Sequence, residues 1–239
     1  MHAVIEFTNM FDMESFINVK NILYFMGQLS GEKTLKLLNK YKIPVVNTSI
    51  LTSKEKVLKA ATAIGYPVVL KLDSPEIVHK SDAGAVITNI ANRNELENAY
   101  DKLKSIDVKL NGYIISKQVT GTEVIVGGKK DEHFGAVVMF GVGGVFVEIL
   151  KDVSLRIAPV MKKDAYEMLD EIQARGILDG ERGYPKANRV KLAELIVNVS
   201  KLIYKEDIEE LDLNPCFVDE NSVGVADFRM LVRDKSGKP

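Results

Sequence analysis

A lysine interrupts an apolar run early in the chain. Lys71 lies in Val-Val-Leu-Lys-Leu (68–72), a pattern typical of a buried strand. A cation at the end of such a strand needs a partner. Either the ammonium reaches water beyond the strand end, or it contacts a phosphate group as a flexible point charge.

A polar loop follows, with the sequence His-Lys-Ser-Asp-Ala-Gly at 79–84. Backbone N–H groups in such a loop can cradle a phosphate, and Lys80 would add positive charge. A neutral imidazole at His79 can act as a nucleophile and carry a phosphoryl group. The simpler alternative is a solvated or structural histidine, and the residues alone leave both open.

Two further segments could contact a nucleotide. Glu123 opens an expected strand after Gly121 and Thr122, as an exposed edge carboxylate or as a partner of a ribose hydroxyl. The glycines at 141–144 lack the dinucleotide-binding spacing and favour a tight hairpin. Shortly after them, Lys151 and Arg156 could bring cations near a transferring phosphoryl group.

The sequence Glu-Glu-Leu-Asp-Leu-Asn-Pro (209–215) alternates, which would put Glu210, Asp212 and Asn214 on one strand face. Asp227 is expected on the neighbouring strand. Oxygen ligands converging from paired strands suit Mg²⁺, which accepts carboxylates, phosphate oxygens and water. The alternative is a solvated polar face, which we expect for Glu209 and Glu210. Asn214 fits that alternative less well because asparagine disfavours strands and Pro215 cannot occupy a central ladder position.

The elements that must position these residues follow from periodicity. Helices are expected from the apolar spacings at 35–41, 57–64, 96–103, 168–172 and 192–203. Strands are expected at 68–72, 85–90, 112–119, 123–126, 136–140, 145–149, 208–213, 216–218 and 222–228. Short glycine-rich connectors in the second half favour antiparallel neighbours. The sequence predicts an α+β fold with an arm at 1–22, a smaller lobe at 23–110 and a larger lobe at 111–239.

Composition narrows the class of protein. The 239 residues carry a net charge of −1, with 46% hydrophobic residues and a single cysteine, Cys216. Neither the charge nor the 7% aromatic content points to nucleic acid. The apolar runs are too short to span a membrane. One cysteine excludes an internal disulfide and fits a reducing, cytoplasmic setting.

Together these motifs resemble the β subunit of ADP-forming acetyl-CoA synthetases, a family similar to succinyl-CoA synthetase. The likeness extends over residues 29–228 and includes the long segment at 138–159. It implies an ATP-grasp fold with nucleotide between two lobes, ATP or ADP and Mg²⁺ as cofactors, and the reaction acyl-CoA + ADP + phosphate ⇌ carboxylic acid + CoA + ATP. One departure is Ala85, where the family commonly has a second glycine; a positive φ there would strain alanine.

The resemblance also implies residue roles. His79 corresponds to the histidine that relays the phosphoryl group, and Lys71 and Arg156 to nucleotide or phosphate contacts. Glu123 corresponds to a contact with the nucleoside. The adenine hinge corresponds to Ser116, Lys117, Gln118 and Val119. Metal ligands correspond to Asn214 and Asp227, with Asp212 as a third.

The chain contains no glycine-rich βαβ unit for CoA and no second catalytic histidine motif. In this family both belong to an α subunit, so the resemblance implies an α partner in an α₂β₂ assembly. Two other functions use the same nucleotide site: a self-contained ATP-grasp ligase that joins a carboxylate to an amine without His79, and a regulatory module that binds ATP without turnover.

Overall fold

The computed structural model describes residues 26–77 and 80–233, which fall into two units. Of the described residues, the smaller unit takes in 29–36, 45–77 and 80–119, and the larger unit takes in 26–28, 37–44 and 120–233. The strand at 112–117 is therefore part of the smaller unit, whereas the expected boundary at 110 assigned it to the larger lobe. The expected arm at 1–22 lies outside the described residues.

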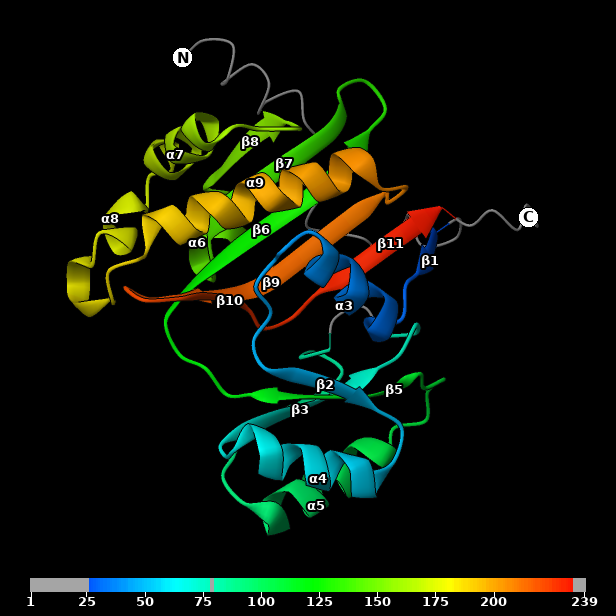
Figure 1. Cartoon of the computed structure of the whole chain (residues 1–239). Coiled ribbons are helices and arrows are strands. Elements are labelled where there is room, and N and C mark those ends of the chain that lie inside the picture. Colours follow the sequence, from blue (N-terminus) through cyan, green and yellow to red (C-terminus); the bar gives the residue numbers. More distant parts are fainter. Residues whose placement is uncertain (1–25, 78–79, 234–239) are drawn as a thin grey trace. The chain divides into compact units, whose positions relative to one another are not determined.

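The smaller unit is a four-stranded antiparallel sheet with two helices on one face (Figure 1). Its strand order is β2-β5-β3-β4, with β2 at Thr48–Leu51, β3 at Val68–Asp73, β4 at Val86–Ile90 and β5 at Gly112–Lys117. The helices are α4, Lys54–Ile64, and α5, Arg93–Lys104. A third helix, α3, covers Gly31–Lys40, and its first residues belong to this unit.

The apolar spacing of α4 explains how it packs. Val57, Leu58 and Ala61 are buried against the sheet and α5, as the helical periodicity predicts. The helix ends at Gly65, whose φ of +80° suits glycine and whose N–H donates to the Ala61 carbonyl. The N-cap residue of α4 is Ser53, whose side chain makes no capping hydrogen bond.

The larger unit is built on a seven-stranded antiparallel sheet of order β1-β11-β9-β6-β7-β8, with β10 paired to β9. The strands are β1 (Met26–Gln28), β6 (Thr122–Asp131), β7 (Gly135–Val142), β8 (Val153–Ile157), β9 (Glu210–Val218), β10 (Val223–Val225) and β11 (Arg229–Arg233). The helical elements are α6 (Val145–Glu148), α7 (Lys162–Glu171), α8 (Arg175–Leu178), the 3-10 turn η3 (Glu181–Gly183) and α9 (Arg189–Lys205).

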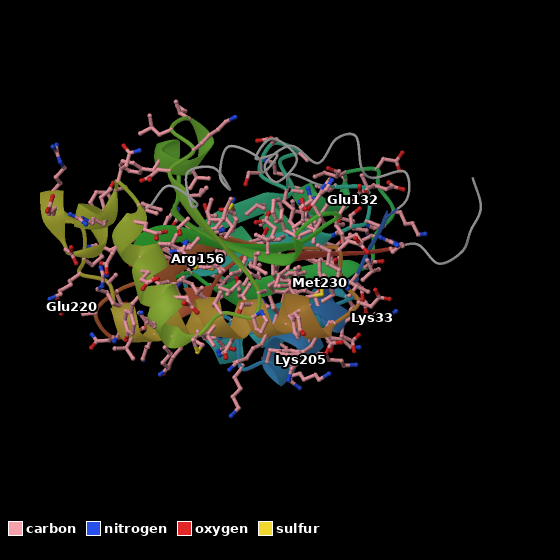
Figure 2. All side chains as sticks on the ribbon, turned by 90° about the horizontal axis from the view of Figure 1, so that it is seen from above. Lys33, Glu132, Arg156, Lys205, Glu220 and Met230 are labelled. Atoms are coloured by element: carbon pink, nitrogen blue, oxygen red, sulfur yellow. The ribbon has the colours of Figure 1, made fainter. Side chains whose placement is uncertain are left out.

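Helix α9 covers one face of this sheet and packs on β6 and β7 (Figure 1). The approach is close at Gly128, where an added Cβ would lie 3.1 Å from the Ile203 Cβ. Leu211 is the register partner of Gly128, so Leu211 also faces α9. Because side chains alternate along a strand, Glu210 and Asp212 point to the opposite face. A perpendicular view shows Met230 inside the unit, while Glu132, Lys205 and Glu220 project from its ends and turns (Figure 2).

The predictions for residues 141–149 are wrong, and some strands of this unit were not predicted. Residues 145–148 form helix α6 instead of a strand, and β8 and β11 were not predicted. The glycines at 141–144 do not form a hairpin, since β7 continues to Val142 and leads into α6. The physical reason is packing. A Cβ added to Gly141 would lie only 2.7 Å from the Val147 Cγ2, so the Val147 side chain packs directly on Gly141. This contact overrides the strand propensity of Val-Phe-Val.

Within the described ranges, no helix is long and apolar enough to cross a membrane.

Candidate functional site

The break in β9 places Asn214 at the surface. The pairing of β9 with β6 shifts between Leu213 and Cys216, because Val124 pairs with Cys216 and Val126 with Leu213. Pro215 has no N–H to donate, which favours an interruption of the ladder here. Leu213 and Cys216 on either side are buried, and Asn214 is exposed.

The same break holds Asp227. The expected strand at 222–228 ends at Val225, so Asp227 lies in the connection between β10 and β11 instead of on a strand. The backbone N–H groups of Ala226 and Asp227 donate to the Pro215 carbonyl, at 3.0 and 3.3 Å. The structure thus brings Asp227 next to the Asn214–Pro215 step.

Asp212 is half-buried and lies two residues before Asn214 in β9. Its register partner on β11 is Arg229. Its neighbour Glu210 is not on a solvated face as predicted: Glu210 is 4% exposed, and the Arg229 Nη2 donates to its Oε1 at 2.7 Å. Burial raises the pKa of Glu210 to about 7, although the charge of Arg229 acts in the other direction. Glu209 is also buried and pairs with Arg233.

Glu123 is exposed on β6, where it pairs with Phe217. The Gly143 N–H donates to the Glu123 carbonyl at 2.8 Å, and a Cβ on Gly143 would lie 3.0 Å from the Glu123 Cβ. Both residues line a pocket of about 300 Å³. Its lining residues are Gly121, Thr122, Glu123, Val142, Gly143, Gly144, Phe146 and Tyr184. The glycine segment therefore lies against Glu123.

In the smaller unit, Lys71 lies inside β3 and not at its end. It is the register partner of Ile114 of β5 and Val86 of β4 and is 6% exposed, which disfavours the alternative in which its ammonium reaches water beyond the strand end. Leu70 and Leu72 pack in the core with α4 and α5. By alternation, Lys71 points to the sheet face opposite these helices.

The hinge residues divide between the two faces. Ser116 pairs with Val69 and shares the Lys71 face. Lys117 points to the helix face, where its Nζ donates to the carbonyls of Gly65 and Tyr66 at 2.9 and 3.0 Å. The Lys117 ammonium thus holds the end of α4, and the Lys117 backbone N–H donates to the Asn47 carbonyl at 2.9 Å. The Gln118 N–H donates to the Pro67 carbonyl, and Val119 closes the segment.

His79 lies outside the described residues, and so do its contacts. Lys80, directly after it, is 8% exposed. The loop closes through hydrogen bonds from the Ala85 N–H to the Lys80 carbonyl and from the Gly84 N–H to the Ser81 carbonyl. The positive φ, +63°, is at Gly84, and Ala85 has none. The backbone strain that a positive φ would cause at Ala85 is therefore absent.

The Arg156 side chain connects β8 to α7. Its guanidinium pairs with Glu171 and reaches the Ser154 hydroxyl at 3.3 Å (Figure 2 labels Arg156). Burial alone would raise the pKa of Glu171, but the hydrogen bonds from Arg156 and Ser154 hold that pKa below its usual value. The Asp152 carboxylate also makes structural hydrogen bonds, because it accepts from the backbone N–H groups of Gln173 and Ala174.

We expect Arg156→Ala to lower the free energy of unfolding by about 1 kcal/mol at pH 7, since a half-buried charged hydrogen bond is lost. The folded-state pKa of Glu171 is depressed, so its contribution is present above the unfolded pKa and disappears as the pH falls through the folded pKa. Urea unfolding at pH 7 and about pH 3 measures this. Arg93→Ala, at an exposed pair with Glu97, is the control. A pH-independent difference would contradict the assignment.

The donor set at the β9 break fits Mg²⁺ only with help from a ligand. Within residues 26–77 and 80–233, no three His, Cys, Asp or Glu side chains group so that they could hold a metal ion by themselves. Asp212, Asn214 and Asp227 offer two carboxylates and one amide. Mg²⁺ commonly uses one or two carboxylates and completes its shell with phosphate oxygens and water, which suits a nucleotide site.

The buried ion pair between Glu210 and Arg229 was not predicted from the sequence. Arg229 was overlooked because no strand was predicted after Phe228, although Met-Leu-Val between two arginines (229–233) is a short strand signal.

Comparisons with known proteins identify the family. The ATP-grasp domain model matches residues 26–232. The β subunit of ADP-forming acetate–CoA ligase I from Pyrococcus furiosus is 45% identical over 205 residues, which cover 82% of this chain and 88% of that subunit. The ADP-forming acetate–CoA ligase I of Archaeoglobus fulgidus is 40% identical over 225 residues, 91% of this chain. The chain spans only 33% of that longer protein.

Solved structures agree. An acetyl-coenzyme A synthetase of Candidatus Korarchaeum cryptofilum, in complex with coenzyme A and Ca-AMPCP, has a TM-score of 0.82 at 33% identity, covering 87% of this chain and 94% of that chain. In another structure of that synthetase, with Mg-AMPPCP, the phosphohistidine segment points towards the nucleotide-binding site. The α+β, ATP-grasp prediction is confirmed, and the chain belongs to the ATP-grasp domain family and, within it, to the group of β subunits of ADP-forming acetate–CoA ligases.

Proposed function

We propose that this chain is the nucleotide-handling subunit of an ADP-forming acyl-CoA synthetase, which interconverts acyl-CoA, ADP and phosphate with carboxylic acid, CoA and ATP. The observation that carries the proposal is the hydrogen bond from the Asp227 backbone N–H to the Pro215 carbonyl, which holds the backbone of Asp227 next to the Asn214–Pro215 step. The side-chain oxygens of Asn214 and Asp227 are of the kind that suits a Mg²⁺-bound nucleotide. The relationship to separate β subunits supports the choice of reaction.

Each unit carries its own set of proposed nucleotide or metal contacts. In the smaller unit, Lys71 would contact phosphate from the face of β3 opposite α4 and α5, and the backbone at 116–119 would contact adenine. In the larger unit, Glu123 contacts the ribose, and Asp212, Asn214 and Asp227 hold Mg²⁺. The metal ion would neutralise the charge of the phosphate groups. Arg156 is a weaker candidate for phosphate contact because Glu171 and Ser154 already engage it.

His79 is the proposed acceptor of the phosphoryl group. An imidazole nitrogen would attack the γ-phosphorus of ATP, the bond to the bridging oxygen would break, and ADP would leave; the reverse sequence makes ATP. The unperturbed pKa of histidine, about 6.5, keeps much of the imidazole neutral near pH 7, as nucleophilic attack requires.

The proposed partner is an α subunit that binds CoA and carries a second phosphohistidine, in an α₂β₂ assembly. The similarity to separate β subunits of Pyrococcus furiosus, of which this chain covers 88% and 89%, supports this. Its charge and composition favour neither nucleic acid nor a membrane as a partner. The single cysteine, buried in β9, is consistent with a cytoplasmic enzyme.

Incubation with γ-labelled ATP and Mg²⁺, with and without a candidate α subunit, tests the proposal. We expect an acid-labile, base-stable phosphoenzyme, and label transfer to phosphate when the α subunit, acetate and CoA are added. Ligation of a carboxylate to an amine by the chain alone would favour the self-contained ligase. Binding of ATP with no label and no turnover would favour a regulatory module.

A further inference from the structure

A buried arginine lies beside the proposed metal ligands. Arg229, the first residue of β11, is 8% exposed, and its Nη2 donates to Glu210 Oε1. Its other terminal nitrogen, Nη1, is buried and has no hydrogen-bond partner within the described part of the chain. An unsatisfied buried donor is costly and calls for a specific explanation.

The strand register shows what Arg229 adjoins. Asp212 pairs with Arg229 on β11 and with Gly127 on β6, and register partners project from the same face. Glycine has no side chain, so Arg229 is the side chain that flanks Asp212 across the sheet. Arg229 also follows Asp227 by two residues, with buried Phe228 between them. Arg229 is therefore a neighbour of two proposed metal ligands. It is the register partner of Asp212 across the sheet, and it lies two residues after Asp227 in the chain.

Charge gives this placement a purpose. Glu210 and Asp212 project from the same face of β9, and like charges so close repel each other. Arg229 offsets that repulsion while its hydrogen bond to Glu210 fixes the guanidinium. A clamp between β11 and the start of β9 does not require a buried arginine, since the exposed Arg233 of β11 already pairs with Glu209, the residue before β9.

We infer that Arg229, held by Glu210, is a positioning residue that sets the Asp212 and Asp227 carboxylates for a Mg²⁺-bound nucleotide. The inference rests on the proposed function of this site. Residues that orient ligands in this way typically change metal affinity by about 10–100-fold when removed. The effect should therefore appear in the metal-dependent part of nucleotide binding.

The test must separate positioning from folding. Removing Arg229 alone leaves a buried carboxylate unpaired, which is strongly destabilising, whereas replacing both partners by apolar residues is often tolerated. The informative variant is thus the double substitution Glu210→Leu with Arg229→Met, in the full chain. Arg233→Met, which removes the exposed arginine that pairs with Glu209 immediately before β9, is the matched control.

Thermal unfolding first shows that the variants fold, and calorimetry then measures ADP affinity with and without Mg²⁺. We expect the double variant to lose about 10–100-fold in Mg²⁺-dependent affinity, with metal-free ADP binding unchanged and the control like wild type. Arg229→Lys, which keeps the charge but not the planar fork, should retain part of the affinity.

A folded double variant with wild-type Mg·ADP affinity would overturn the positioning role, and so would an equal loss with and without Mg²⁺. If the double variant does not fold, the comparison of Arg229→Lys with Arg233→Met decides by the same criterion. A wild-type chain that binds no Mg·ADP would instead overturn the proposed function itself, because no metal–nucleotide site would remain for Arg229 to serve.

Discussion

Replacing His79 with alanine should lower turnover of the complex with its α subunit by orders of magnitude, while folding and ADP binding persist. The reason is that the phosphoryl group loses its proposed acceptor beside the nucleotide, and no other side chain type in the loop 80–84 can replace a neutral imidazole near pH 7. A merely structural loop histidine would instead change stability by about 1 kcal/mol and leave turnover nearly intact.

His133→Ala is the matched control for His79→Ala. His133 follows Asp131 in the turn between β6 and β7, and its side chain is 84% exposed. Its removal should change neither turnover nor phosphorylation. Wild-type turnover in the His79 variant would end the relay hypothesis. Acid-labile label retained on that variant would assign the acceptor to another residue.

Asp227→Asn should weaken Mg²⁺-dependent ADP binding and reduce activity with it. The substitution keeps the backbone hydrogen bonds to Pro215 and nearly the same side-chain volume, but it removes a charged ligand from the proposed metal site. The expected loss is about tenfold or more in Mg·ADP affinity, measured by calorimetry, since the phosphates lose part of their metal bridge.

Asp107→Asn provides the comparison for Asp227→Asn, because Asp107 is an exposed aspartate after α5 and far along the chain from β9. Its Mg·ADP affinity should match wild type. Unchanged Mg·ADP affinity and activity in Asp227→Asn would make Asp227 a structural residue and would leave the β9 break without its proposed task.

Periodicity predicted the elements whose local signals agree with their packing. The buried face of α4 follows directly from Val57, Leu58 and Ala61. The turn at 219–221 joins β9 to β10 as expected, because the Asp219 carboxylate accepts the N–H groups of Asn221 and Ser222. In both cases a short stretch of sequence contains the whole physical cause.

Elements that depend on distant contacts could not be predicted in the same way. Val-Phe-Val at 145–147 has the composition of a strand, yet Val147 packs against Gly141 and the segment is helical. The direction of the Lys117 side chain depends on the register of β5 with β3 and on the end of α4. No spacing within 116–119 indicates either.

The proposed site shows the same division. The sequence predicts that Asn214 and Asp227 lie near each other, and the Asp227 backbone N–H does donate to the adjoining Pro215 carbonyl. Their role as metal ligands stays a prediction. The pattern failed for Glu210, because its burial arises from Arg229 on a strand that the sequence did not predict. A carboxylate in an alternating strand looks solvated until its cross-strand partner is known.

The most direct test of the account is ATP formation from acetyl-CoA, ADP, phosphate and Mg²⁺, measured with this chain alone, with the α subunit alone and with both. The account predicts ATP only when both chains are present, and none when the β chain carries His79→Ala. ATP formed from acetyl-CoA by this chain alone, or none from a complex that contains both folded chains, would contradict it.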